Sequence, residues 1–289
     1  MLPLAERIDL AASLEGFRRP GDDLMDRFDG TRLIRTVPTL AGFVPYICLL
    51  RPGGHDRVEV LTRTSDEAAL AEPLVRRLFV TVGNDWERLL ADDIVLARLD
   101  HSHPGIRQVL QHDLFTALVR SISAQQINLR WASTIRARLA ERFGDRYEIG
   151  NEFVYSLNVD HIAAADPAEI RAMQFTTRKA ESIVALAQEF AEGRLRTESM
   201  REMADEEIIT RLVQLKGIGL WSAEWILART LGRARVVAGD LGVRKAVGRA
   251  YRDGEMPSEI EVRRLTAHWG ESATVAQALV LHAAAVGAT

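Results

Sequence analysis

The chain has 289 residues, of which 47% are hydrophobic and 27% are charged, with a formal net charge of −3. This composition is typical of an ordinary soluble globular protein with a real core. No run approaches the roughly 20 apolar residues of a membrane-spanning helix, and the start, MLPLAERIDL, lacks the cationic stretch of a secretory signal. One cysteine, Cys48, can form neither an internal disulfide nor a cysteine-rich metal site, so we expect a cytoplasmic protein.

The first 84 residues differ in pattern from the rest of the chain. Segments rich in β-branched and apolar residues predict strands at 31–40, 43–50 and 57–62. Pro-Gly-Gly at 52–54 predicts a turn between the second and third strands, and a leucine at every fourth position indicates a helix at 68–79. We therefore expect an N-terminal α+β domain over residues 1–84 that contains an antiparallel sheet.

From residue 85 onward, apolar residues recur at three-to-four spacing, which is typical of helices. The expected helices cover 106–122, 129–143, 178–191, 205–215, 220–230, 241–251, 260–267 and 275–286. The segment Gly144–Ser156 is expected to be a flexible connection. The sequence thus predicts an α+β fold with a mostly helical region over 85–289.

Positive charge is concentrated in one part of the chain. Residues 211–250 contain eight Arg or Lys and two acidic residues, although the whole chain is negative. Local charge, rather than net charge, meets a phosphate backbone, so this segment is a candidate for nucleic-acid binding. A basic helical face in water would give the same pattern.

The most informative stretch is a predicted helical hairpin at 213–229. A helix ends near Leu215, Gly217-Ile218-Gly219 follows, and a second helix begins at once. Glycine tolerates positive φ and leaves backbone N–H groups open at the start of the second helix, where an anion is favoured. This arrangement favours phosphate binding over a simple helix–helix turn.

Asp240 follows an apolar extended segment and precedes the next predicted helix. An aspartate in this position is an ideal N-cap, and most such residues are only caps. Its position 21 residues after Gly219 raises a catalytic alternative.

The pattern L-x-G-I-G-x-x-x-A, followed about twenty residues later by Asp240 and a basic helix start, resembles the helix-hairpin-helix DNA glycosylase superfamily. Phe115–Asn128 and His161–Ser182 extend the resemblance. An N-terminal α+β unit occurs in the 3-methyladenine DNA glycosylase II (alkylation-repair) branch and in the 8-oxoguanine branch. The resemblance implies a two-lobed helical core and a protein that acts on double-stranded DNA in the cytoplasm, as a monomer.

The resemblance also implies a mechanism. The enzyme would flip a damaged purine into a pocket, where the Asp240 carboxylate stabilises the developing sugar cation. Bifunctional relatives carry a Schiff-base lysine where this chain has Trp221, so the resemblance implies hydrolytic release of alkylated purines such as 3-methyladenine and 7-methylguanine without strand cleavage. The expected pocket residues are Trp221, Trp225, Phe17 and Leu241.

Other positions are assigned by the same resemblance. The expected DNA contacts are Gln125, Gln126, Lys216, Gly217, Gly219, Arg244 and Lys245, and Gln126 rather than Gln125 would fill the gap left by the flipped base. No cofactor is required, but the family binds a monovalent cation (Na⁺ or K⁺). The matching backbone carbonyls belong to Val213, Leu215 and Ile218.

One departure leaves the substrate open. Downstream of Trp269, the alkylation-repair branch usually has a Pro-aromatic-Arg run, whereas this chain has Ser272 in place of the aromatic residue. A glycosylase for another damaged purine and a non-catalytic DNA-binding protein are therefore the alternatives. His101 and His103 could instead mark a metal site, but no acidic or cysteine cluster supports it.

Overall fold

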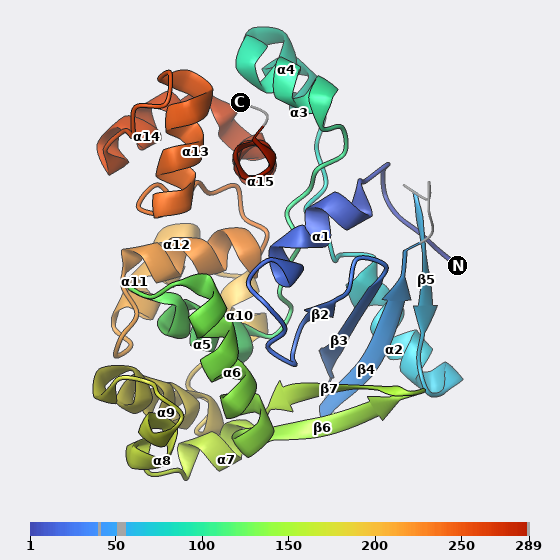
Figure 1. Ribbon diagram of the computed structural model, residues 1–289, viewed down its shortest axis with the longest axis vertical. Coiled ribbons are helices and arrows are strands. Elements are labelled where there is room, and N and C mark those ends of the chain that lie inside the picture. The colour runs from blue at the N-terminus through green and yellow to red at the C-terminus, as the bar shows by residue number, and fades with distance from the viewer. Residues whose placement is uncertain (40–41, 51–55, 288–289) are drawn as a thin grey trace.

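The computed structural model describes residues 1–39, 42–50 and 56–287, and it places a sheet-containing half beside a larger helical half (Figure 1). Five antiparallel strands form the main sheet in the spatial order β1-β5-β4-β3-β2. They are Leu2–Pro3 (β1), Arg27–Phe28 (β2), Arg32–Thr39 (β3), Gly42–Leu49 (β4) and Arg57–Leu61 (β5). The three strands expected from the sequence are confirmed as β3, β4 and β5, whereas the turn expected at 52–54 lies outside the described residues.

The two faces of this sheet have different partners, because alternate residues of a strand point to opposite sides. Leu33 and Val37 of β3 are fully buried in one apolar cluster with side chains of two helices. These helices are α1 (Leu10–Arg18) and α2 (Ser65–Val75), and α2 corresponds to the helix expected at 68–79. In Figure 1, the segment that follows α1 lies close to the helical half.

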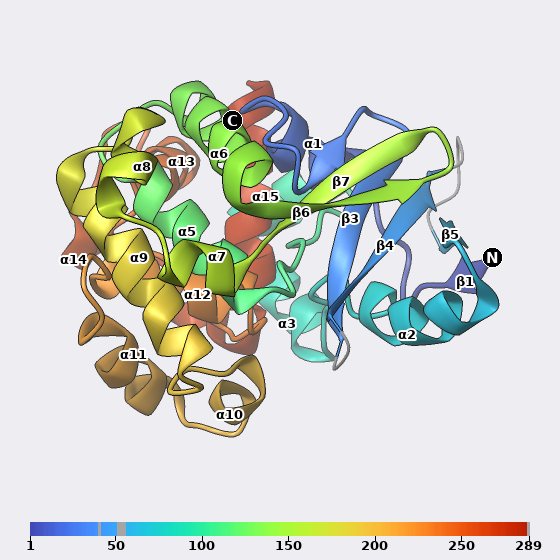
Figure 2. The same cartoon turned by 90° about the horizontal axis from the view of Figure 1, so that it is seen from below.

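The segment 144–156 is a β-hairpin, so the prediction of a flexible connection was wrong. Its strands are Gly144–Ile149 (β6) and Glu152–Leu157 (β7), which pair along their whole length. The hairpin lies across the second face of the sheet (Figure 2), where Ile149 and Val154 pack against Ile34 and Ile47. These partners come from a distant part of the chain, so local composition did not reveal the strands.

The helices form two lobes, each with its own apolar core. The first lobe contains α5 (Leu114–Ala124), α6 (Leu129–Phe143), α7 (Val159–Ala163), α8 (Pro167–Ala172), α9 (Thr177–Ala191), α10 (Thr197–Arg201), α11 (Asp205–Val213) and α12 (Leu220–Arg229). The second contains α3 (Asp85–Asp92), α4 (Ile94–Ser102), α13 (Leu241–Tyr251), α14 (Glu259–Leu265), the 3-10 helix η1 (Ala267–Ser272) and α15 (Ala273–Val286). The predicted α+β fold with a two-lobed helical region is confirmed.

The helix expected at 106–122 begins only at Leu114, so the prediction was wrong for its first part. Residues before Leu114 run extended: the Val80 N–H donates to the Gln108 carbonyl at 2.9 Å, and the Leu110 N–H donates to the Leu78 carbonyl at 2.7 Å. Asp113 then caps α5 by accepting a hydrogen bond from Thr116 N. This extended stretch supplies one wall of the site described below.

Within the described residues, no helix has both the length and the apolar character needed to cross a membrane.

Candidate active site

The predicted hairpin is present between α11 and α12, and it requires glycine at its first turn position. Gly217 has a φ of +83°, and a Cβ there would lie 2.5 Å from Ser182 Oγ. Ile218 is 5% exposed and is anchored in the core. Gly219 is the N-cap of α12, and no atom would meet a Cβ there within 4 Å. The exposed first turn of α12 therefore offers backbone N–H groups in open space.

Gln125 holds the hairpin against the end of α5. Its Nε2 donates to the Gly217 carbonyl at 2.9 Å and lies 3.4 Å from Ser222 Oγ. Lys179 Nζ donates to the carbonyls of Ser123 and Gln125 at 2.9 and 2.7 Å, and burial lowers the pKa of this amine. The Gln125 amide is thus engaged inside the protein, and Lys179 is a positioning residue that the sequence reasoning missed.

Gln126, unlike Gln125, is exposed to solvent. Its backbone is left-handed, with φ of +54°, which is uncommon for a residue other than glycine. Leu129, at the start of α6, is 59% exposed and lies at the edge of the neighbouring cavity. The structure therefore brings an exposed polar and an exposed apolar side chain to the same end of α5, and only the first was selected from the sequence.

Asp240 is the N-cap of α13, and each of its carboxylate oxygens has a different donor. Oδ1 accepts from Val243 N at 3.0 Å, and Oδ2 accepts from Trp221 Nε1 at 2.9 Å. A Cβ at Gly242 would lie 3.0 Å from Oδ1, so the small residue there leaves room for the carboxylate. The Trp221 bond joins α12 to α13 and fixes the direction of a carboxylate that a simple cap would not need to orient.

Asp240 lines a cavity of about 370 Å³ between the two lobes and α1. Trp221 and Trp225 lie one turn apart on α12 and both line it, and Phe17 contributes from α1, as predicted. Leu241 is not among the lining residues and its side chain is 54% exposed. The size and the aromatic walls suit a single flat ring system.

The wall formed by α15 contains no Phe, Tyr or Trp. Ala278, Leu281 and His282 line the cavity there. Trp269 and Ser272 are buried in the second lobe and do not line the cavity. Among the residues that the structure describes, the Phe and Trp side chains at the wall therefore come from α1 and α12.

Arg229 follows Trp221 and Trp225 at the same four-residue spacing on α12. It was not selected from the sequence. Its guanidinium carbon lies 5.5 Å from the centroid of the Trp225 ring, and it lines the same cavity. Burial lowers the pKa of this guanidinium, and the charge of Asp240 opposes the effect. The four-residue spacing from Trp225 was the signal available in the sequence.

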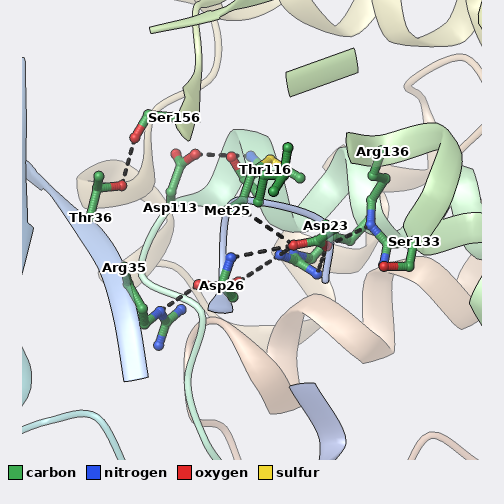
Figure 3. A network of polar contacts seen from close by, with 12 residues as sticks. Asp23, Met25, Asp26, Arg35, Thr36, Asp113, Thr116, Ser133, Arg136 and Ser156 are labelled. Atoms are coloured by element: carbon green, nitrogen blue, oxygen red, sulfur yellow. Dashed lines mark hydrogen bonds and ion pairs between the residues drawn. The ribbon is translucent and has the colours of Figure 1, made fainter. Parts of the chain in front are cut away.

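A buried network of acidic and basic side chains forms part of the cavity wall, because Asp23, Arg120 and Arg136 line it. Asp23 accepts from Arg120 Nη2 at 3.0 Å and from Arg136 Nε at 2.9 Å, and Asp26 pairs with Arg35 and Arg120 (Figure 3). Burial by itself would raise the Asp23 pKa, but the two guanidinium groups outweigh it and lower the value to about 2. The network ties the segment after α1, which carries part of the cavity wall, to α5 and α6.

Most of the basic side chains between 211 and 250 bond other groups of the protein, although those of Arg211, Lys216 and Arg249 do so at the surface. Those of Arg211, Arg233, Arg244 and Arg249 donate to backbone carbonyls, and those of Lys216, Arg233 and Arg235 form salt bridges. Lys216 is exposed and lies 2.7 Å from Glu181, whereas Arg244 is half-buried against the Pro257 carbonyl. Lys245 is exposed on α13 and makes no hydrogen bond or salt bridge with the residues the structure describes. Of the cations selected for DNA contact, Lys245 is thus the one left free.

Two predicted metal features can be placed in the structure. The Leu215 carbonyl accepts from Ile218 N at 3.1 Å and keeps a second lone pair, so the neutral backbone oxygens of the hairpin suit a hard monovalent cation. His103 contacts the His282 ring at 5.0 Å. Among the described residues, no group of three or more His, Cys, Asp or Glu side chains could hold a metal ion.

The comparisons with known proteins identify the family. A model described as the HhH-GPD superfamily of base excision DNA repair proteins matches residues 119–272, which include the hairpin and Asp240. The chain belongs to this superfamily. The resemblance inferred from the Gly-Ile-Gly hairpin and Asp240 is therefore confirmed.

The relatives include several 3-methyladenine glycosylases. The structure of 3-methyladenine DNA glycosylase from Archaeoglobus fulgidus aligns over 100% of this chain and 99% of that one, with a TM-score of 0.84 and 26% identity. DNA-3-methyladenine glycosylase 2 of Escherichia coli is 30% identical over 134 residues, which cover 46% of this chain and 47% of that protein. The enzyme of Schizosaccharomyces pombe, solved in complex with abasic DNA, has a TM-score of 0.56 and 25% identity over 66% of this chain and 92% of that one. The match spans about half the length of the curated relatives.

Proposed function

We propose that this protein is a monofunctional DNA glycosylase of base excision repair, which hydrolytically releases alkylated purines such as 3-methyladenine and 7-methylguanine from duplex DNA. The observation that carries the proposal is the Asp240 carboxylate, oriented by Trp221 at the wall of a cavity with three aromatic side chains. The names of the Archaeoglobus and Escherichia relatives support the choice of 3-methyladenine.

The duplex would be held at the hairpin. The open N–H groups at the start of α12 would bind a phosphate, and Lys245 would add a positive charge. The carbonyls of Val213, Leu215 and Ile218 would hold a monovalent cation, which would increase the positive potential at this phosphate. The Schizosaccharomyces relative was solved in complex with abasic DNA, which supports DNA as the ligand.

The reaction would take place on a nucleotide turned out of the helix, because the glycosidic bond cannot be reached in the stack. The base would enter between the aromatic walls, and the sugar would lie next to Asp240. As the bond to the base breaks, positive charge develops on the sugar, and the fixed carboxylate would stabilise it and orient the attacking water. An alkylated purine is a good leaving group, so the site needs no strong general acid.

The test is an assay of base release by chromatography from a panel of damaged duplexes, including methylated DNA. Release of 3-methyladenine and 7-methylguanine supports the proposal. If only a different damaged purine is released, the proposed substrate is wrong and the protein is a glycosylase for that purine. Duplex binding without release from any member of the panel would favour a non-catalytic DNA-binding protein.

Strand cleavage is expected to be absent. Within the described residues, no lysine lines the cavity, and Lys179 Nζ, at the end of α5, is held by the carbonyls of Ser123 and Gln125. Without a free amine, no imine can form with the sugar. Borohydride treatment during turnover should therefore trap no covalent complex, and DNA should be nicked only after added base. Nicking without base treatment would contradict the assignment of Trp221.

Gln126 is expected to fill the space left by the flipped nucleotide. Replacement of Gln126 by alanine should lower single-turnover base release from duplex DNA roughly tenfold, which corresponds to the loss of about one hydrogen bond to the orphaned base. A matched control is Gln174→Ala, because Gln174 is also exposed, has a φ of +75° and does not line the cavity. If Leu129→Ala slows release while Gln126→Ala does not, the filling residue is the apolar one.

A further inference from the structure

The cavity has two chemically different ends, because three lining residues lie along one face of α12. Trp221, Trp225 and Arg229 follow one another at four-residue spacing, and Trp221 is bonded to Asp240. A helix rises about 1.5 Å per residue, so the backbone of Arg229 lies roughly 12 Å further along the axis than that of Trp221. The Arg229 side chain reaches back over the Trp225 ring. In the proposed function the sugar lies at the Asp240 end. The far edge of the base would therefore point toward Arg229.

Two buried polar groups at this far end lack a partner. Gln111 is 8% exposed and its Oε1 forms no hydrogen bond, and the same is true of Arg229 Nε. The two residues are neighbours, because the Gln111 N–H donates to the Arg229 carbonyl at 2.8 Å. Both line the cavity. Buried polar groups without partners cost stability, and a ligand with complementary atoms removes that cost.

The Arg229 guanidinium has no direct ion-pair partner among the described residues, although the charge of Asp240 reaches it and raises its pKa against the effect of burial. It stacks on Trp225, and it makes no hydrogen bond or salt bridge with any residue that the structure describes. A guanidinium only donates hydrogen bonds, whereas the free Gln111 Oε1 only accepts them. The far end of the cavity thus presents an acceptor beside a group of donors.

We propose that Gln111 and Arg229 are specificity-determining residues that read the far edge of the flipped base and favour a 6-oxopurine over a 6-aminopurine. The inference rests on the proposed function. A 6-oxopurine carries an acceptor, O6, next to the N1–H donor, which matches Arg229 and Gln111 respectively. A 6-aminopurine carries the reverse order, with amino hydrogens facing the guanidinium donors. The pocket would therefore prefer guanine-derived or deaminated lesions to adenine-derived lesions.

The experiment compares base release from one methylated DNA sample, which contains 7-methylguanine and 3-methyladenine, and from a duplex that contains hypoxanthine. Arg229→Gln is expected to lower release of 7-methylguanine and hypoxanthine about tenfold or more, while release of 3-methyladenine changes little or rises. Gln111→Leu should shift the ratio in the same direction. Arg229→Lys keeps the charge over Trp225 but loses the forked donors of the guanidinium. This variant should fold like the wild type and still lack the preference for 6-oxopurines.

Arg249→Gln is a matched control, because Arg249 is exposed on α13, bonds the Ala284 carbonyl and does not line this cavity. Equal losses for all bases in Arg229→Gln, or an unchanged ratio, would overturn the inference while the proposed function stands. Absence of release of every base by the wild-type protein would overturn the proposed function itself, and the inference with it.

Discussion

Replacement of Asp240 by asparagine is expected to reduce the rate of base release by a factor on the order of 10²–10³ or more. Asparagine is an equally good N-cap, and its single carbonyl oxygen can still accept from Val243 N, so the fold should be preserved. The amide NH2 that takes the place of Oδ2 cannot accept from Trp221 Nε1, so that bond is lost. It lacks the negative charge that would stabilise the sugar cation. Single-turnover release from methylated DNA measures the loss, and fluorescence anisotropy with an abasic duplex should show that DNA binding persists.

The matched control for this variant is Asp166→Asn. Asp166 is also an N-cap, at the start of α8, where it accepts from Ala168 N at 2.8 Å, but it does not line the cavity. It should retain full activity. Full activity of Asp240→Asn would show that Asp240 is only a helix cap and that the proposed mechanism is wrong.

Removal of the Asp23 carboxylate is expected to have the largest effect on stability. In Asp23→Ala, the buried guanidinium groups of Arg120 and Arg136 lose their shared partner. Breaking a buried ion pair from one side typically costs about 3–5 kcal/mol, because a charge remains without compensation. Urea unfolding at neutral pH measures the change in free energy of unfolding. A change below about 1 kcal/mol would contradict this account of the network.

The effect should also depend on pH. The Asp23 pKa is lowered from its ordinary value of 3.8 to about 2 in the folded protein. Its ionisation therefore stabilises the fold fully above about pH 4, and this contribution is lost as the pH falls through 2. The stability difference between wild type and Asp23→Asn should shrink over that range. Asp22→Asn is the control, because its exposed carboxylate pairs with Arg27 at the surface, where a pair contributes about 1 kcal/mol or less.

The candidate site was partly visible in the sequence because some of its requirements are local. A turn that needs positive φ at Gly217 requires glycine wherever the rest of the chain lies. The spacing from Gly219 to Asp240 and the repeat from Trp221 to Trp225 are likewise properties of neighbouring residues. The hairpin, the cap at Asp240 and the aromatic side chains of the cavity could therefore be placed by pattern.

The remaining parts of the site depend on residues that are far apart in the chain. Gln111 and Arg229 become neighbours only because an extended segment before α5 lies beside the end of α12. Asp23 meets Arg136 across 113 positions, and neither residue carries a local signal of that pairing. The basic segment at 211–250 looked like a surface for phosphates, but folding directs most of its side chains to internal acceptors.

The sequence by itself determined the class of fold, the hairpin and the position of the carboxylate, because periodicity, glycine conformation and helix capping act over a few residues. Only the tertiary structure decided that 144–156 forms a hairpin on the sheet, that Gln125 bonds the hairpin while Gln126 is exposed, and that Arg229 faces the cavity. These features arise from burial between distant segments. The energy of each such interaction depends on which distant residues come into contact, and a local sequence pattern does not predict those contacts.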